Sequence, residues 1–336
     1  MAATTTSSPS TSQPAPRSPL AALRAIGFRR EVALVIAIVV VLVIASIFRP
    51  QTFPTLNNLQ AVMRNLAFDG IMAIGMLLLM VGGVFDLSVG GMFSMAGVIV
   101  GSLMNVNGVP TPIAMAVGLS CAALGGFANG LIVAKLKVNA LITTLGTMGI
   151  FRGIAIFIGG PGINFLPDDF NAIGQSTFLG FQFGVWLLLF LVLLFGYLMT
   201  RTRFFRQYYY VGGNQKAALL SGMNVERLQI IGFMISAFLA GLAGIVFASR
   251  VESAISIAGD GAELRVVTAV VLGGASLTGG KGNVFGVLLA ILFIALIRNV
   301  IIVFGIPSTL DQITIGLVLI GALALDTVVN RRRGTA

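Results

Sequence analysis

The chain has 336 residues, of which 57% are hydrophobic and 10% are charged. Because a soluble domain carries about 25% charged residues, this composition excludes an ordinary soluble protein. The formal net charge of +10 does not indicate nucleic-acid binding, since the lysines and arginines collect at the ends of apolar runs, as they do in membrane proteins. We predict an all-α fold, a polytopic transmembrane helix bundle surrounded by the lipid bilayer.

The chain has one cysteine, Cys121, and no histidine. A single cysteine excludes an internal disulfide, and its place in an apolar run is typical of a packing residue. Without histidine the chain lacks the commonest metal ligand and proton relay. We expect no catalytic, cofactor-binding or metal-binding residue in this chain.

The N-terminus is rich in Ser, Thr, Ala and Pro, and we predict residues 1–28 to be a disordered cytoplasmic tail. No small-residue cleavage site follows the first apolar segment, so we expect a retained span and not a signal peptide. Residues 29–330 form the predicted transmembrane domain, and residues 331–336 form a basic cytoplasmic tail.

Apolar runs predict about ten membrane spans. The eighth is short and rich in glycine, so we expect a broken or half-length helix there. The ten predicted spans cover residues 32–48, 59–81, 87–105, 111–134, 138–158, 183–200, 228–249, 264–278, 284–304 and 310–328.

Basic residues predict the topology, because cytoplasmic loops carry an excess of Lys and Arg. If Arg24, Arg29 and Arg30 keep the N-terminus inside, the junctions after spans four, six, eight and ten are also cytoplasmic. Those junctions carry Lys135, Lys137, Arg201, Arg203, Arg206, Lys216, Arg227, Lys281, Arg331, Arg332 and Arg333. We therefore predict a multi-pass membrane protein with both termini cytoplasmic.

The loop 159–182 contains Asp168 and Asp169 but no basic residue, so the same rule places it outside. Two interpretations are open for it: contact with a soluble partner, or a loop that is merely solvated.

Residues 81–91 (VGGVFDLSVGG) hold Asp86, Ser88 and Gly90 between two apolar spans. A carboxylate close to the bilayer is costly unless it faces water, a partner or the bundle interior, which makes it a functional-site candidate. Alternatively, Asp86 or Ser88 caps the next helix. We take these three residues as candidates for the transport pathway or for a break between helices.

Residues 271–286 (VLGGASLTGGKGNVFG) contain four further candidates of this kind, Gly273, Gly274, Gly279 and Gly280. The lysine after the glycines suggests a phosphate-binding loop, but that motif needs a Gly where Ala275 stands and a Ser or Thr where Gly282 stands. The chain should therefore not hydrolyse ATP itself. Most of these glycines suit close packing of helices.

The loop 201–228 interrupts the apolar sequence with charged residues and tyrosines. Within it, the run 215–220 favours a helix and Gly222 suits its end. Such a short helix either docks into a groove on another protein or serves only as a linker.

Three stretches, DLSVG at 86–90, KAALLSG at 216–222 and VVLGGASLTGGKGNVFG at 270–286, resemble the permease subunits of bacterial ABC importers of the ribose, xylose and autoinducer-2 type. Weaker similarity runs through residues 128–153 and 238–250. One departure is visible: family members commonly read GGIDLSVG, whereas GGVFDLSVG has one more residue before Asp86. On a helix that residue would rotate the positions after it by about 100°.

The resemblance implies a permease subunit of an ATP-binding-cassette importer in the bacterial inner membrane. This subunit would form the pathway for a sugar or a similar small polar solute. Its implied partners are a second permease subunit, two cytosolic ATPases that carry ATP and Mg, and a soluble solute-binding protein. In such importers a cytoplasmic coupling helix meets the ATPase, and that role maps onto Lys216, Ala217, Ala218, Ser221 and Gly222. Neither the solute nor the choice between homodimer and heterodimer follows from the sequence.

A rival hypothesis is a secondary transporter driven by an ion gradient. It predicts a relay of carboxylates or histidines within the membrane and often two similar halves. The absence of histidine and of an obvious repeat argues against it.

Overall fold

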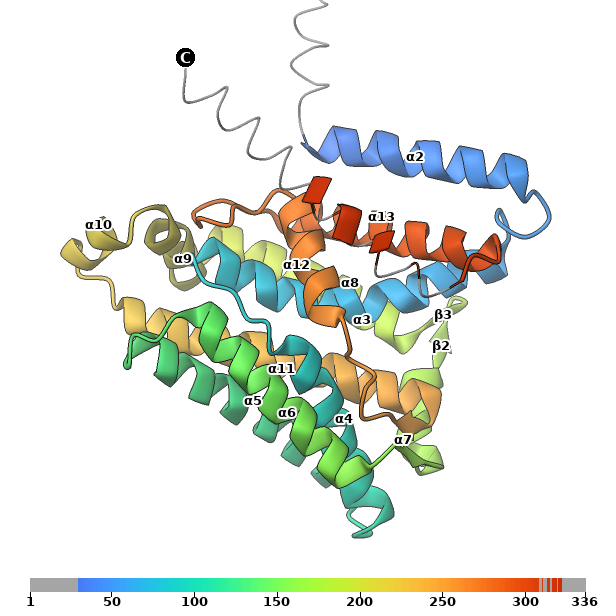
Figure 1. Ribbon diagram of the computed structural model, residues 1–336, viewed down its shortest axis with the longest axis horizontal. Helices are drawn as coiled ribbons and strands as arrows, with labels where there is room; N and C mark the ends of the chain where they lie inside the picture. The colour runs from blue at the N-terminus through green and yellow to red at the C-terminus, as the bar shows by residue number, and fades with distance from the viewer. Residues whose placement is uncertain (1–29, 308–309, 311–312, 315, 319, 322–336) are drawn as a thin grey trace, which may run out of the picture.

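The computed structural model describes residues 30–307, 310, 313–314, 316–318 and 320–321, and Figure 1 shows their arrangement. Short helices and two pairs of two-residue strands connect the long helices; β1 is antiparallel to β4, and β2 to β3. The elements are α2 (Arg30–Phe48), α3 (Leu56–Val81), α4 (Val89–Asn105), α5 (Thr111–Ala134), α6 (Ala140–Gly159), β1 (Ile163–Asn164), α7 (Asp168–Gln175), β2 (Thr177–Phe178), β3 (Phe181–Gln182), α8 (Phe183–Arg201), α9 (Arg203–Gly213), α10 (Gln215–Leu220), α11 (Val225–Val251), β4 (Ser253–Ala254), α12 (Ala262–Leu272) and α13 (Val284–Val303).

Seven helices in the described part of the chain are long and apolar enough to cross a membrane: α2, α3, α5, α6, α8, α11 and α13. Together with the apolar 17-residue α4, they correspond to the first seven predicted spans and the ninth. The polytopic helical fold is therefore confirmed, whereas the count of about ten spans stays a prediction.

The eighth predicted span, 264–278, overlaps only one helix, the 11-residue α12. At 1.5 Å per residue α12 is about 17 Å long, roughly half the hydrocarbon thickness of a bilayer. The helix ends at Gly273, and the chain turns there before α13 begins. The tenth predicted span, 310–328, lies partly outside the described residues. Both predicted tails, 1–28 and 331–336, lie wholly outside them.

The helices form two groups in Figure 1, with α2, α3, α8 and α13 in the upper one and α4, α5, α6 and α11 in the lower one. α11 joins the two groups, because it packs on α3 of the upper group as well as on α4 and α5 of the lower group. The packing is close: a Cβ on Gly244 of α11 would lie 1.9 Å from the carbonyl oxygen of Phe93. Such approach suits helices in lipid, where the hydrophobic effect does not drive helices together.

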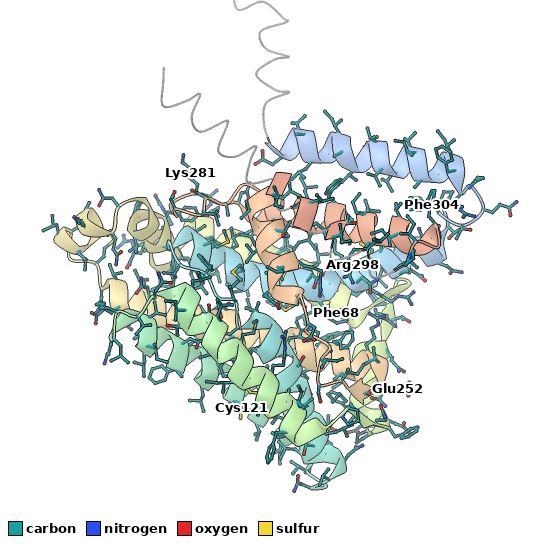
Figure 2. All side chains as sticks on the ribbon, viewed as in Figure 1. Phe68, Cys121, Glu252, Lys281, Arg298 and Phe304 are labelled. Atoms are coloured by element: carbon teal, nitrogen blue, oxygen red, sulfur yellow. The ribbon has the colours of Figure 1, made fainter. Side chains whose placement is uncertain are left out.

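The loops alternate between two ends of the bundle. At one end, Lys137 after α5 pairs with Glu226 at the start of α11 (2.9 Å). At the other end, Asn105 after α4 donates to the carbonyl of Asn164 (2.9 Å), and β1 pairs with β4 after α11. Figure 2 shows Lys281 and Glu252 at these opposite ends. The described helices therefore cross alternately, as the predicted topology requires; which end is cytoplasmic stays a prediction.

Candidate functional site

The loop 201–228 folds into two helices, α9 and α10, at the far end of the bundle (Figure 1). The Asn214 side chain caps α10 by accepting from the amide of Ala217 (3.0 Å). Gly222 follows the end of α10 with φ of 80°, a conformation that only glycine adopts without strain, and this prevents the helix from continuing. The predicted helix over residues 215–220 is confirmed with the same bounds.

The five predicted coupling residues do not share one face of α10. Ala218 is buried at 4% exposure. The other four are exposed: Lys216, Ala217, Ser221 and Gly222.

The sequence interpretation passed over two apolar residues of α10. Leu219 is 54% exposed and Leu220 is 91% exposed. In the sequence they could have been noticed as two adjacent leucines in a short helix between charged residues. A leucine so exposed at the end of the bundle is a candidate contact for another protein.

Three Gly-Gly pairs that are far apart in the sequence meet at the C-terminal end of α9. They are Gly82–Gly83, Gly212–Gly213 and Gly279–Gly280, and we name them the glycine junction. A Cβ on Gly212 would lie 1.9 Å from the Val81 carbonyl oxygen, and a Cβ on Gly279 would lie 2.8 Å from the Gly212 Cα. Main chain therefore packs on main chain here, with no room for a side chain at Gly212, Gly279 or Gly280.

Two hydrogen bonds tie α9 to neighbouring segments, and a third joins α3 to the segment before α13 at the glycine junction. The Gly280 amide donates to the Val81 carbonyl (2.8 Å), and the Tyr209 hydroxyl donates to the Gly282 carbonyl (3.0 Å). The Tyr208 hydroxyl donates to the carbonyl of Leu228 on α11 (2.7 Å). Burial raises the pKa of Tyr208, so its hydroxyl keeps its proton. α9 is thereby joined to α11 and to the segment before α13, and that segment is joined to α3.

The other two glycines of the 271–286 motif lie between α12 and α13. A Cβ on Gly273 would lie 2.6 Å from the main chain of Val287, so glycine permits the contact between these helices. Gly274 follows in the turn, where its amide donates to the Val271 carbonyl (3.0 Å). All four candidate glycines of the motif therefore sit at a break between two helices.

Asp86 and Ser88 lie in the break between α3 and α4 and are fully buried. Asp86 Oδ1 accepts from the amide and the hydroxyl of Ser88 (2.8 and 2.5 Å), and Asn129 Nδ2 of α5 donates to Ser88 Oγ (2.9 Å). Ser88 is the N-cap residue of α4, yet its side chain makes no capping hydrogen bond. The carboxylate thus orders the break and does not cap the first turn of α4 directly.

Two further observations concern this break. The extra residue before Asp86 falls in the non-helical segment 84–86, so the rotation expected for a helix does not apply. Gly90 leaves space for the carboxylate of Glu263, which would lie 2.4 Å from a Cβ at that position.

The structure therefore does not bring the predicted site residues together at one place. Gly279 and Gly280 join α9 at one end of the bundle, whereas Asp86, Ser88 and Gly90 lie between α4, α5 and α12. Among the described residues, no group of three His, Cys, Asp or Glu is placed to hold a metal ion. The arrangement is a bundle of apolar helices with two breaks, one between α3 and α4 and one between α12 and α13. The short helix α10 lies at one end of the bundle.

The chain belongs to the family described as branched-chain amino acid transport system / permease component, which matches residues 58–323. It is therefore a permease subunit that forms a translocation pathway in the inner membrane, and ATP hydrolysis belongs to a separate subunit. The resemblance to permeases of ABC importers is confirmed.

Two relatives are similar over nearly their whole length. The L-arabinose transport system permease protein AraH of Escherichia coli K12 is 35% identical over 91% of this chain and 93% of its own. The autoinducer 2 import system permease protein LsrC of Shigella flexneri is 34% identical over 90% of this chain and 89% of its own. No solved structure matches. The family description and the two relatives name different solutes, so membership leaves the solute of this chain open.

Proposed function

We propose that the chain is the permease of an ATP-driven importer for a sugar or a similar small polar solute. The class of solute comes from the names of the relatives. The observation that carries the coupling to ATP is α10, a capped helix that presents Leu220 at 91% exposure at one end of the bundle.

In the proposed assembly two permease subunits, identical or paralogous, enclose the pathway between them. Two cytosolic ATPases, which hold ATP and Mg, contact the α10 helices, and a soluble solute-binding protein contacts the opposite end. There the loop 159–182 presents the exposed Asp168 and Asp169 at the start of α7.

The proposed mechanism transmits movement through the glycine junction. When the ATPases close, they push on α10, and α9 passes the displacement to α3 and to the segment before α13 through main-chain contacts. The bundle thereby shifts between inward-open and outward-open arrangements, a two-state change biased by a ligand.

The alternative, a secondary transporter, gains one supporting observation. Asp69 lies in the middle of α3, so an intramembrane carboxylate exists. Its oxygens pair with Arg265 at 3.0 and 3.2 Å, however, so Asp69 is engaged in an ion pair with an arginine and is not part of a relay of carboxylates or histidines. We therefore favour the ATP-driven importer.

The substitution Leu220→Asp tests the coupling role of α10. The fully exposed side chain does not support the fold, so the variant should insert normally. An unpaired carboxylate buried in the interface costs about 2 kcal/mol or more, which corresponds to at least about a 30-fold loss of affinity. The measurement is co-purification of the ATPase with the permease, together with ATP-dependent uptake.

The exposed residue Leu264 of α12, at 51% exposure, provides the control. Leu264→Asp should leave co-purification unchanged because α12 lies away from α10. Normal ATPase binding by Leu220→Asp would contradict the docking role. Uptake that survives loss of ATP but collapses with the proton gradient would contradict the importer itself.

A further inference from the structure

Five charged residues from α6, the turn before α12, α12, α3 and α13 follow one another through ion pairs and one hydrogen bond to the main chain. Arg152 Nε lies 2.9 Å from Asp260 Oδ1, and Arg265 donates to the Asp260 carbonyl at 3.3 Å. Arg265 also holds both carboxylate oxygens of Asp69, and Arg298 Nη1 lies 3.7 Å from Asp69 Oδ2. We name Arg152, Asp260, Arg265, Asp69 and Arg298 the charged line.

Two members of the charged line, Asp69 and Arg152, lie well inside helices that are long and apolar enough to cross a membrane. Asp69 is the fourteenth of the 26 residues of α3, about 18 to 20 Å from either end of that helix. Arg152 lies about 10 Å or more from either end of α6. Charges at this depth face the bundle interior or a water-filled space, because exposure to lipid is costly.

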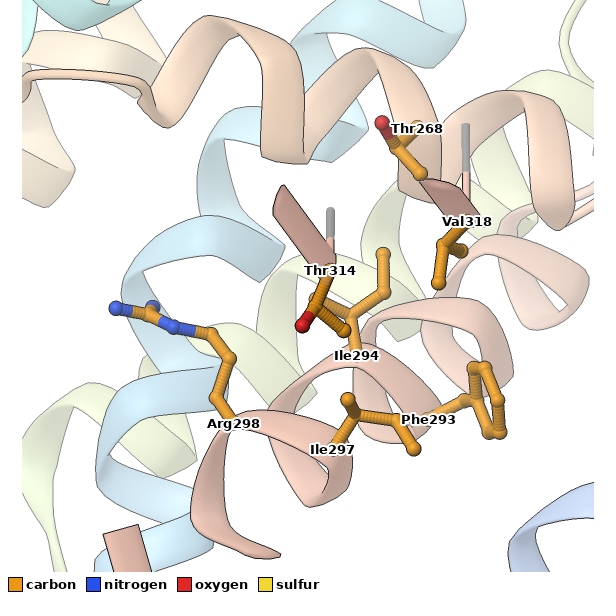
Figure 3. Close-up of a pocket in the computed structure, with 7 residues that line it drawn as sticks. All are labelled: Thr268, Phe293, Ile294, Ile297, Arg298, Thr314 and Val318. Atoms are coloured by element: carbon orange, nitrogen blue, oxygen red, sulfur yellow. The ribbon is translucent and has the colours of Figure 1, made fainter. Parts of the chain in front are cut away.

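Burial within the chain does not account for the charged line. The side chain of Asp260 is 47% exposed, that of Arg298 is 33% exposed and that of Arg152 is 29% exposed. Figure 2 shows Arg298 on the face where α12 crosses the bundle. In Figure 3 its guanidinium extends away from the apolar side chains of Ile294 and Ile297 around it. The exposed charges therefore require water on this face.

A nearby carboxylate also lacks a donor. Glu263, in the first turn of α12, is 9% exposed, and its Oε2 has no hydrogen-bond partner among the described residues. A buried carboxylate oxygen without a partner is unfavourable. A donor that enters beside α12, such as a water or a hydroxyl group, would satisfy it.

We infer that the charged line and Glu263 form one wall of the aqueous path, and that this wall takes neutral, polyhydroxylated solutes. Carboxylates only accept hydrogen bonds and guanidinium groups only donate them, whereas a sugar hydroxyl does both. A wall where the two alternate satisfies hydroxyl groups in any orientation, and its paired charges give no preference for an ion. This inference rests on the proposed function and adds the residues that meet the solute.

Thiol labelling tests whether the charged line meets water. In a Cys121→Ser background, Arg298→Cys and Asp260→Cys are treated in intact membranes with a charged, membrane-impermeant methanethiosulfonate. Phe190→Cys on α8, where the native side chain is 60% exposed and expected to face lipid, is the control. We expect both line positions to react about tenfold faster or more, since a thiol in lipid ionises poorly. Rates equal to that of the control would overturn the inference.

A second measurement needs no substitution in the charged line. The unaltered protein is treated with a water-soluble carbodiimide and an amine, and amidation is located by mass spectrometry. Asp260 should be amidated, and the fully buried Asp86 should not. A mixture of neutral pentoses and hexoses should slow the amidation of Asp260, whereas L-leucine at equal concentration should not.

Each outcome of these measurements has a meaning of its own. An unmodified Asp260 would overturn the aqueous wall, and equal protection by sugar and leucine would overturn the solute class. Neither measurement depends on uptake or on the ATPase, so failure of the inference is distinct from failure of the proposed function.

Discussion

Single glycines decide whether the main chains can meet at the glycine junction. Gly212 and Gly213 are neighbours in α9, yet their surroundings differ. A Cβ on Gly212 would lie 1.9 Å from the Val81 carbonyl oxygen and 2.5 Å from the Gly280 amide nitrogen, whereas nothing lies within 4 Å of one on Gly213. Identical substitutions at adjacent positions therefore probe contact and helix propensity separately.

We predict that Gly212→Ala destabilises the permease by about 1–3 kcal/mol through overpacking. Gly213→Ala should be neutral or slightly stabilising, because alanine favours a helix over glycine. Thermal unfolding of the purified permease in detergent measures both effects. Equal melting temperatures for the two variants would show that the three segments do not meet as described.

The ion pair of Asp69 could not be predicted from the sequence. Its partner Arg265 is 196 residues away, so no local pattern joins them. The contacts of the Gly-Gly pairs are equally hidden, because glycine has no side chain whose polarity or size would mark its neighbour. The residues of the break at Asp86 were visible as a motif, but their hydrogen bonds with Asn129 were not.

Elements were predicted better than contacts, for physical reasons. A span must be apolar over its whole length, so hydropathy alone marked α3, α5, α11 and the others. Ala, Leu and a final glycine marked α10 equally well. Its orientation was not predictable, because the burial of Ala218 and the exposure of Leu220 depend on how α9 positions the helix.

The link between α9 and the segment before α13 gives a prediction at the scale of elements. Tyr209→Phe removes the hydroxyl that donates to the Gly282 carbonyl (3.0 Å), at a cost of about 1 kcal/mol. We expect the ratio of solute imported to ATP hydrolysed to fall in the reconstituted importer, since movement of α9 reaches α13 less completely.

Tyr210→Phe is the matched control for this prediction. The Tyr210 hydroxyl accepts a hydrogen bond from the exposed Arg206 of the same helix (3.1 Å), and the residue is 49% exposed. Its loss should leave the ratio unchanged. The same decrease in both variants would argue against the link through Tyr209.

The loops gather at two opposite ends of the helix bundle, and labelling can assign each end to one side of the membrane. In a Cys121→Ser background, Asp169→Cys and Lys281→Cys carry the only thiol, each at an exposed position. We predict that a membrane-impermeant maleimide labels Asp169→Cys in intact cells and Lys281→Cys only after lysis. The reverse pattern would invert the predicted topology and place α10 away from cytosolic ATPases.

The glycine junction also bears on how such permeases can diversify. Its contacts involve main-chain atoms, so its geometry is independent of the side chains that line the charged face around α12. If the proposed coupling and the proposed wall hold, the drive from the ATPase and the choice of solute reside in separate parts of the chain. Exchange of wall residues between relatives with different cargo should redirect uptake while leaving the mechanical linkage untouched.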